Sequence, residues 1–359
     1  MNSSALTPTI DDIQRSNVPF MLSMALLFMV LFLVSLNTGN MTIDIQQAVL
    51  KLYSDSQGVA SSIEQTLAAY TLFELRLPRI LMASCVGAML AIAGCTMQAV
   101  ARNPLADPGL IGISGGAAAA AAAAILFLPL LDIPFIPYSL VLAACGFVGA
   151  LLAVWLVINI AKSQTGINLA NLILAGVAIN ALATTVIGLS SYVADDDALR
   201  QITYWTLGSL GGSDWPKTVT VLIGTLLCGG FFLSIHTPLN LLSLGESEAF
   251  AMGLNVKRYR TLSLWVVALG VALATAMCGV VGFVGLVVPH IARKLVGANH
   301  QRLLPSCALM GASLMLFADL ISRSIAPPLE IPIGIVTSAI GAPYLLYLLK
   351  KRQQNTPYA

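Results

Sequence analysis

Three arginines stand where apolar stretches begin or end, and their side chains could recognise carboxylates. Arg76 and Arg79, in the sequence RLPR, begin one apolar stretch, and Arg323 ends another. A planar guanidinium binds a carboxylate through two parallel hydrogen bonds, so these arginines could receive acidic side chains of another protein. Two other interpretations remain open: the arginines could reach lipid phosphates, or they could pair within the chain with Glu74 and Asp319.

The polar loop 236–260 is the second place where side chains could act on a partner. Residues 239–244 predict a short helix, and Gly245 interrupts it. Glu246 and Glu248 favour the start of a second helix, because acidic groups are stabilised at a helix N-terminus. Two short helices would form an elbow on which another protein could dock, although an amphipathic surface loop would give the same pattern.

The composition indicates the kind of structure that must hold these residues. The chain of 359 residues is 57% hydrophobic and 9% charged, with a net charge of +2. Soluble domains carry roughly 25% charged residues, so an apolar chain of this kind belongs in a membrane. Its apolar stretches do not alternate and are about 20 residues long, which indicates helices rather than a β-barrel. A soluble enzyme and a nucleic-acid-binding protein are therefore not expected.

We expect an all-α polytopic membrane protein with ten transmembrane helices. The stretch 261–292 would be about 48 Å long as one helix, which exceeds a hydrocarbon core of about 30 Å. Gly279, Gly282 and Gly285 divide it into a full span and a shorter one. The expected spans are 20–36, 80–101, 109–131, 137–161, 168–193, 218–235, 261–278, 285–291, 303–322 and 331–349.

The positive-inside rule gives the orientation of these spans. Ten spans place most Lys and Arg residues in the cytosol, together with both termini. Residues 1–19 would then be a cytosolic segment, 20–349 a single transmembrane domain, and 350–359 a cytosolic tail.

Few groups in the spans could bind an ion, a metal or a nucleotide. Asp319 lies one turn before Arg323, where a local ion pair is expected. An ion-coupled secondary transporter needs ionisable groups at membrane depth, so that class is the weaker alternative. The six cysteines lack the spacing of metal ligands, and no G-x-x-x-x-G-K-[ST] sequence occurs. If the chain pumps, the energy must come from another chain.

Several segments together resemble one family, the FecCD-type permeases of bacterial ABC importers for iron chelates, haem and cobalamin. They are RLPRILMASCVGAMLAIAGCTMQAVARNPLADPGLIGISGGA (76–117), LGESEAFAMGL (244–254), GFVGLVVPHIARKL (282–295), LPSCALMGASLMLFADLISR (304–323) and PIGIVTSAIGAP (332–343). The resemblance covers most of the chain from Arg76 onward. It implies a type II importer permease with ten helices per subunit.

The resemblance also implies partners and a location. The chain would be a transport subunit and not an enzyme: it would bind no cofactor or metal, while ATP and Mg would be used by two cytosolic ATPase subunits. A second permease subunit, in a homodimer or a close heterodimer, and a periplasmic binding protein would complete the importer. It would lie in the lipid of the bacterial inner membrane and would not bind nucleic acid.

Functional residues follow from the same resemblance. Glutamates of the binding protein would be seated by Arg76, Arg79 and Arg323. The segment 236–260 would form the coupling helices, with the ATPase contacts at Gly245, Glu246, Glu248, Ala249 and Gly253.

Two further sets would form the transport path. The cytosolic gate would contain Asn103 and Leu105, although a tight turn between helices would have a similar sequence. The fifth span would line the path with Asn180, Thr184 and Ser191, which could instead bond between helices.

The cargo is the least determined property. The stretch 169–215 is most similar to haem-uptake members, which favours haem, while a ferric siderophore or cobalamin remains the alternative. His236, His290 and His300 are all expected on the cytosolic side, so none would bind the iron of arriving haem.

Overall fold

The computed structural model describes residues 10–39, 44–56, 62–130, 137–163 and 166–354. Apart from one short hairpin, the regular elements in these ranges are helices, which confirms the all-α fold. Residues 1–9 of the expected cytosolic segment and 355–359 of the expected tail lie outside the described residues.

The bounds of the elements are as follows. The long helices are α1 (Ile10–Asn37), α4 (Leu77–Ala101), α6 (Tyr138–Ala161), α7 (Leu169–Val193), α9 (Trp215–Ser234), α12 (Val256–Cys278), α14 (His300–Ser324) and α15 (Ile333–Gln354). The shorter helices are α2 (Ile45–Ser56), α3 (Ile63–Tyr70), α5 (Ile113–Phe127), α8 (Asp196–Leu207), α10 (His236–Leu244), α11 (Glu246–Ala251) and α13 (Val284–Val296). Tighter or wider helical turns form η1 (Thr71–Arg76), η2 (Pro108–Ile111) and η3 (Leu128–Leu130), and an antiparallel hairpin joins β1 (Lys162–Ser163) to β2 (Gly166–Ile167).

Most of the expected spans are present as long helices. Seven helices of the described chain are long and apolar enough to cross a membrane, while α5 and α15 contribute shorter apolar helices. The stretch 261–292 is divided as predicted, because α12 ends at Cys278 and α13 begins at Val284. With α13 counted as a short span, each expected span has a helix, but ten crossings stay a prediction.

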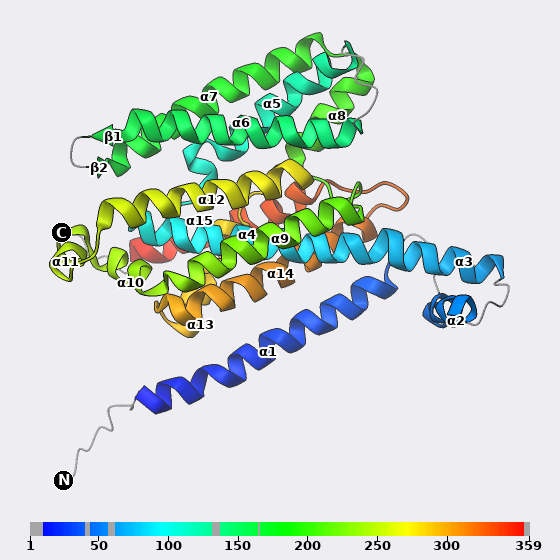
Figure 1. The fold of residues 1–359 in the computed structure, drawn as a ribbon, viewed down its shortest axis with the longest axis horizontal. Helices are drawn as coiled ribbons and strands as arrows, with labels where there is room; N and C mark the ends of the chain where they lie inside the picture. The colour runs from blue at the N-terminus through cyan, green and yellow to red at the C-terminus, as the bar shows by residue number, and fades with distance from the viewer. Residues whose placement is uncertain (1–9, 40–43, 57–61, 131–136, 164–165, 355–359) are drawn as a thin grey trace.

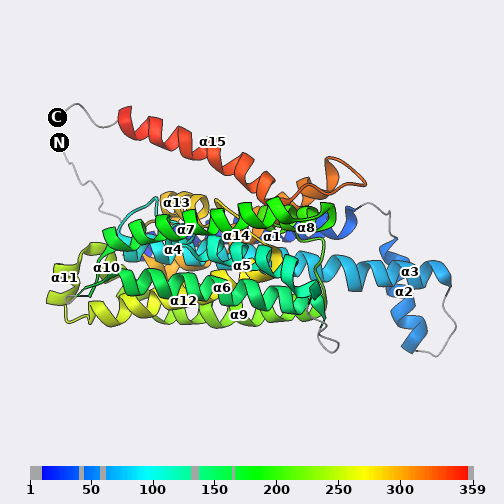
Figure 2. The same cartoon turned by 90° about the horizontal axis from the view of Figure 1, so that it is seen from above.

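The molecule has two distinct ends. Both views place α10 and α11 at one end of the long axis and α2 and α3 at the other (Figures 1 and 2). α3, η1 and α4 run on as a single helix of 39 residues, about 58 Å long, which extends beyond the bundle at the α2–α3 end. α2, α3 and α8 lie between the expected spans and were not predicted from the sequence.

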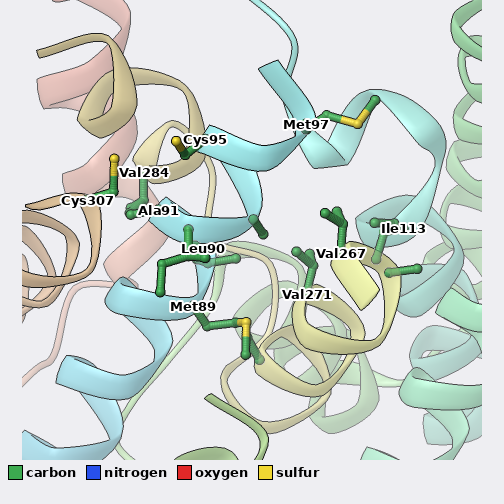
Figure 3. Close-up of a cluster of buried hydrophobic side chains, with 14 of the residues drawn as sticks. Met89, Leu90, Ala91, Cys95, Met97, Ile113, Val267, Val271, Val284 and Cys307 are labelled. Carbon is green, nitrogen blue, oxygen red and sulfur yellow. The ribbon is translucent and has the colours of Figure 1, made fainter. Parts of the chain in front are cut away.

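α4 is the centre of the bundle. Most of its side chains are buried, and it packs against α9, α12, α13 and α14. Figure 3 shows Met89, Leu90 and Ala91 of α4 among side chains of neighbouring helices, including Val267 and Val271 of α12. α1 packs on α14, and α15 joins the core through Ile333 and Val336 near its start and then diverges from the bundle in the second view (Figure 2).

Glycines let α4 approach its neighbours at backbone distance. A Cβ on Gly87 or Gly311 would meet the backbone of the other residue, and a Cβ on Gly94 would meet the backbone of Gly285. Because lipid supplies no hydrophobic driving force between helices, membrane bundles depend on such small-residue contacts. These glycines therefore fix α14 and α13 against α4.

Where helices break inside the bundle, the freed backbone groups bond to one another. The Ser209 N–H donates to the Cys278 carbonyl at 2.8 Å, and the Ile333 N–H donates to the Gly208 carbonyl at 3.0 Å. Gly208 and Gly279 both adopt φ 75°, a conformation that favours glycine. Non-helical backbone is tolerated within a membrane only where protein satisfies it in this way.

We expect Gly311→Val to destabilise the bundle by about 3 kcal/mol, because the new side chain would force α14 away from α4. The measurement is thermal unfolding of the purified chain in detergent. Gly230→Val is the matched control, since a Cβ at Gly230 in α9 meets nothing within 4 Å. Equal unfolding midpoints for the two variants would contradict the packing role of Gly311.

Candidate functional site

The arginines at the α2–α3 end bond within their own chain. The Arg79 Nε lies 2.8 Å from Asp319 Oδ1, and its Nη1 lies 2.8 Å from Glu330 Oε1. Asp319 also lies 3.2 Å through its Oδ2 from the Nε of Arg323. Asp319 is fully buried, so two guanidinium groups compensate one buried carboxylate. The pairing with Asp319 that the sequence left open is present, whereas Glu74 is exposed and Glu330 was not anticipated.

Arg76 and Arg323 also cap the end of α1. Arg323 donates to the carbonyls of Thr38 at 2.7 Å and Ser35 at 3.0 Å, and to the hydroxyl of Ser35. Arg76 donates to the carbonyl of Leu36 at 2.6 Å. The last carbonyls of a helix lack intrahelical partners and carry its negative dipole end, so guanidinium groups stabilise them well. α1 is thereby tied to α4 and α14.

The arginine cluster, Arg76, Arg79 and Arg323, nevertheless faces a cavity. The cavity has a volume of about 270 Å³, and Gly39, Thr71 and Glu330 also line it. The side chains of Arg79 and Arg323 are only 12% and 5% exposed. A partner carboxylate would thus have to enter the cavity, and the docking role of the cluster stays a prediction.

The α4–α5 loop, residues 102–112, folds back into the bundle. A Cβ on Gly285 of α13 would lie 3.0 Å from the Leu90 carbonyl and 3.2 Å from Asp107 Oδ2. Leu90 lies about 16 Å along α4 from its last residue, so the loop reaches that depth. Asp107 accepts a hydrogen bond of 2.7 Å from the Gly109 N–H, which starts η2. The position of this carboxylate inside the bundle was not predicted from the sequence.

The expected gate residues lie in the first turn of this loop. Asn103 is exposed and Leu105 is half-buried. The Asn103 Oδ1 accepts from the Leu105 N–H at 3.0 Å, so the structure brings the two residues together. Their action as a gate stays a prediction.

The predicted elbow is present. α10 and α11 are short helices separated by Gly245, whose φ of 148° permits the sharp change of direction. Gly253, at φ 81°, follows the end of α11. Ala249 is buried against the chain itself, whereas Glu246 and Glu248 are exposed. Phe250 and Met252, which were not predicted, expose 76% and 64% of their surface and form the outward face of the elbow.

The polar residues of α7 divide between two roles. Asn180 donates to the Gly109 carbonyl at 3.0 Å, which ties α7 to the α4–α5 loop. Thr184 is exposed and bonds the Asn180 carbonyl of its own helix, and Ser191 is half-buried. Leu182 and Leu189 on the same helix are 63% and 64% exposed. The structure thus supports a bond between elements for Asn180, while the path-lining role of the three residues stays a prediction.

These features define a class: a polytopic helical permease with broken helices at its centre, a helical elbow at one end and a buried ion-pair cluster at the other. The chain belongs to the FecCD transport family, whose model matches residues 27–351. This assignment confirms the resemblance and removes the ion-coupled secondary transporter as an alternative.

Curated relatives cover most of the chain but carry different cargoes in their names. The hemin transport system permease protein HmuU of Yersinia pestis is 42% identical over 79% of this chain and 84% of its own. The vitamin B12 import system permease protein BtuC of Vibrio cholerae is 39% identical over 82% and 86%. The molybdate import system permease protein MolB of Haemophilus influenzae is 36% identical over 92% and 96%.

A solved structure agrees with the fold. A metal-chelate type ABC transporter in an inward-facing conformation matches with a TM-score of 0.79 and 34% identity, over 93% of this chain and 99% of that one. The chain is therefore a type II ABC importer permease and a multi-pass protein of the inner membrane. It is a transport subunit, and ATP hydrolysis belongs to partner ATPases.

We expect Asp319→Asn to destabilise the chain by about 3 to 5 kcal/mol, because Arg79 and Arg323 would lose their shared buried charge. Thermal unfolding in detergent measures the loss. Glu74→Gln removes an exposed carboxylate from the same end and should leave the midpoint within experimental error. An Asp319→Asn protein with the same unfolding midpoint as the unmodified chain would show that the ion pairs of Asp319 do not stabilise the bundle.

Proposed function

We propose that this chain is the permease of an ATP-driven importer that moves haem across the bacterial inner membrane. The observation that carries the proposal is the 42% identity with a hemin permease over 79% of the chain. The likeness of 169–215 to haem-uptake members supports the same cargo. Cobalamin is the second candidate, because a vitamin B12 permease is 39% identical.

The exposed surface of α7 suits a large and mainly apolar cargo. Leu182, Leu189 and Tyr192 are exposed there, beside Thr184. The three histidines lie on helices other than α7, at the start of α10, in the middle of α13 and at the start of α14. A macrocycle could pass along it without a ligand to its iron. We infer that a second copy of the chain faces α7, with the path between the two copies.

The orientation assigns a partner to each end. We infer that the α10–α11 end is cytosolic and that both termini lie there, because α13 ends with Arg293 and Lys294 at that end. α11 would then seat on an ATPase subunit through Phe250 and Met252, with Asn103 and Leu105 as the nearby gate. The α2–α3 end would face the periplasm.

The arginine cluster would receive acidic side chains of the binding protein through its cavity. Arg79 is already paired with Asp319 and Glu330, so an arriving carboxylate would compete with Glu330, whose side chain is 33% exposed. Charge complementarity of this kind favours rapid and specific association.

Reconstitution tests the cargo. The chain is placed in proteoliposomes with its ATPase and binding protein, and uptake of hemin, a ferric siderophore, cobalamin and molybdate is compared with and without ATP. We expect ATP-dependent uptake of hemin that is at least tenfold above that of the other three. Faster uptake of cobalamin or molybdate would assign a different cargo to the same fold.

We expect Arg79→Gln to weaken association with the binding protein by at least tenfold, because a charge-assisted bond to a carboxylate would be lost. Arg200→Gln, on the exposed surface of α8, is the control and should retain the affinity of the unmodified permease. The dissociation constant is measured in nanodiscs, after thermal unfolding has shown that the variant is folded. An unchanged affinity for Arg79→Gln would refute docking at the cluster.

A further inference from the structure

One carboxylate at the α10–α11 end contacts two arginines from different elements. The Oε1 of Glu246, the first residue of α11, lies 2.5 Å from the Nη2 of Arg260 in α12. The same oxygen lies 3.7 Å from the Nη2 of Arg102, the residue that follows α4. Glu246 therefore contacts α12 and the end of α4, although its side chain is 48% exposed and lines one pocket together with Phe250.

Arg260 also connects Glu246 to a third element, the strand β2. Its Nη1 donates to the carbonyl of Ile167 in β2 at 3.2 Å, and the residue is only 5% exposed. Its Nε is buried without a hydrogen-bond partner in the described structure. The charge of this buried guanidinium is thus compensated by Glu246, with help from one carbonyl dipole. If Glu246 moves, Arg260 must follow or lose its counter-charge.

Arg102 connects Glu246 to the α4–α5 loop, of which it is the first residue. It adopts φ 49° immediately after α4, a left-handed conformation that is uncommon for a residue with a side chain. Asn103 and Leu105 follow directly, and Asp107 and Gly109 anchor the same loop against α13 and α7. A displacement of Arg102 would therefore act on a short loop that is fixed at its far end.

We propose that Glu246 is the positioning residue that makes α11, the α4–α5 loop and the β1–β2 hairpin move as one unit. The hairpin leads into α7, which is inferred to line the transport path, and the α4–α5 loop contains the expected gate residues. The unit therefore contains both segments that would contact the path. The role of this unit in transport rests on the proposed contact between α11 and an ATPase. The mechanical linkage among the three elements depends only on contacts within this chain.

Hydrogen exchange of the full chain in lipid nanodiscs tests the linkage without partners. In Glu246→Gln, amide exchange should become about tenfold faster in β2, because the charge-assisted bond to Arg260 is lost. It should become about threefold faster in residues 102–112, because the longer and more exposed ion pair with Arg102 is lost. Arg102→Gln should have this effect on residues 102–112 and not on β2. Arg258→Gln is the control, because Arg258 is exposed on the same turn of α12 and has no carboxylate partner in the described chain. It should change neither segment.

The outcomes separate the alternatives. Exchange in α4 and α14 reports whether each variant is folded. If Glu246→Gln does not fold, the restricted effect of Arg102→Gln still decides the matter, because that side chain is 43% exposed and tolerates substitution. Unchanged exchange at residues 102–112 in both variants, or an equal effect of Arg258→Gln, would overturn the proposal.

The reconstituted importer adds a functional readout. With hemin as the probe, Glu246→Gln should retain ATP hydrolysis while hemin moved per ATP falls about tenfold. If the unmodified importer moves no hemin but the exchange results hold, the cargo is wrong and the linkage stands. Full coupling in Glu246→Gln would contradict the positioning role.

Discussion

A charge within or beside hydrocarbon must be compensated by its own protein, and this constraint shapes both ends of the bundle. At the α2–α3 end, Asp319 holds Arg79 and Arg323 together, and Arg323 and Arg76 bind carbonyls at the end of α1. At the α10–α11 end, Glu246 compensates the buried Arg260. Because leaving one such group unpaired would cost several kcal/mol, each cluster ties together elements that are far apart in the sequence.

Between these ends, the backbone N–H and carbonyl groups at the centre of the molecule must likewise find partners within the protein. The junction of α8, α12 and α15 places irregular backbone inside the bundle, where Gly208 and Gly279 allow carbonyls and N–H groups to meet. α4 can then pack at backbone distance on α13 and α14 through glycines. A rigid centre with ion-paired ends suits a subunit that transmits motion between partners instead of generating it.

The sequence predicted the parts of this architecture that depend on local pattern. Apolar length located the long helices, and Gly279 and Gly245 marked breaks that the structure contains. It could not predict contacts between residues far apart in the chain. Glu330 and Arg79 are 251 residues apart, and the local sequence around Glu330 does not indicate a partner at that separation. The acidic residues indicated that a helix starts at Glu246, but helix propensity does not reveal that its side chain contacts Arg260 of α12. The position of Asp107 inside the bundle likewise depends on tertiary packing.

The central claim is that motion imposed on α11 reaches the α4–α5 loop without being absorbed between them. Paired spin labels at Ser247 and Leu105 in the reconstituted importer would measure this directly, with and without a non-hydrolysable ATP analogue. We expect the distance within one subunit to stay constant, while the distance between the Leu105 labels of the two proposed copies changes by about 5 Å. A change within the subunit, with no change between the subunits, would contradict the account.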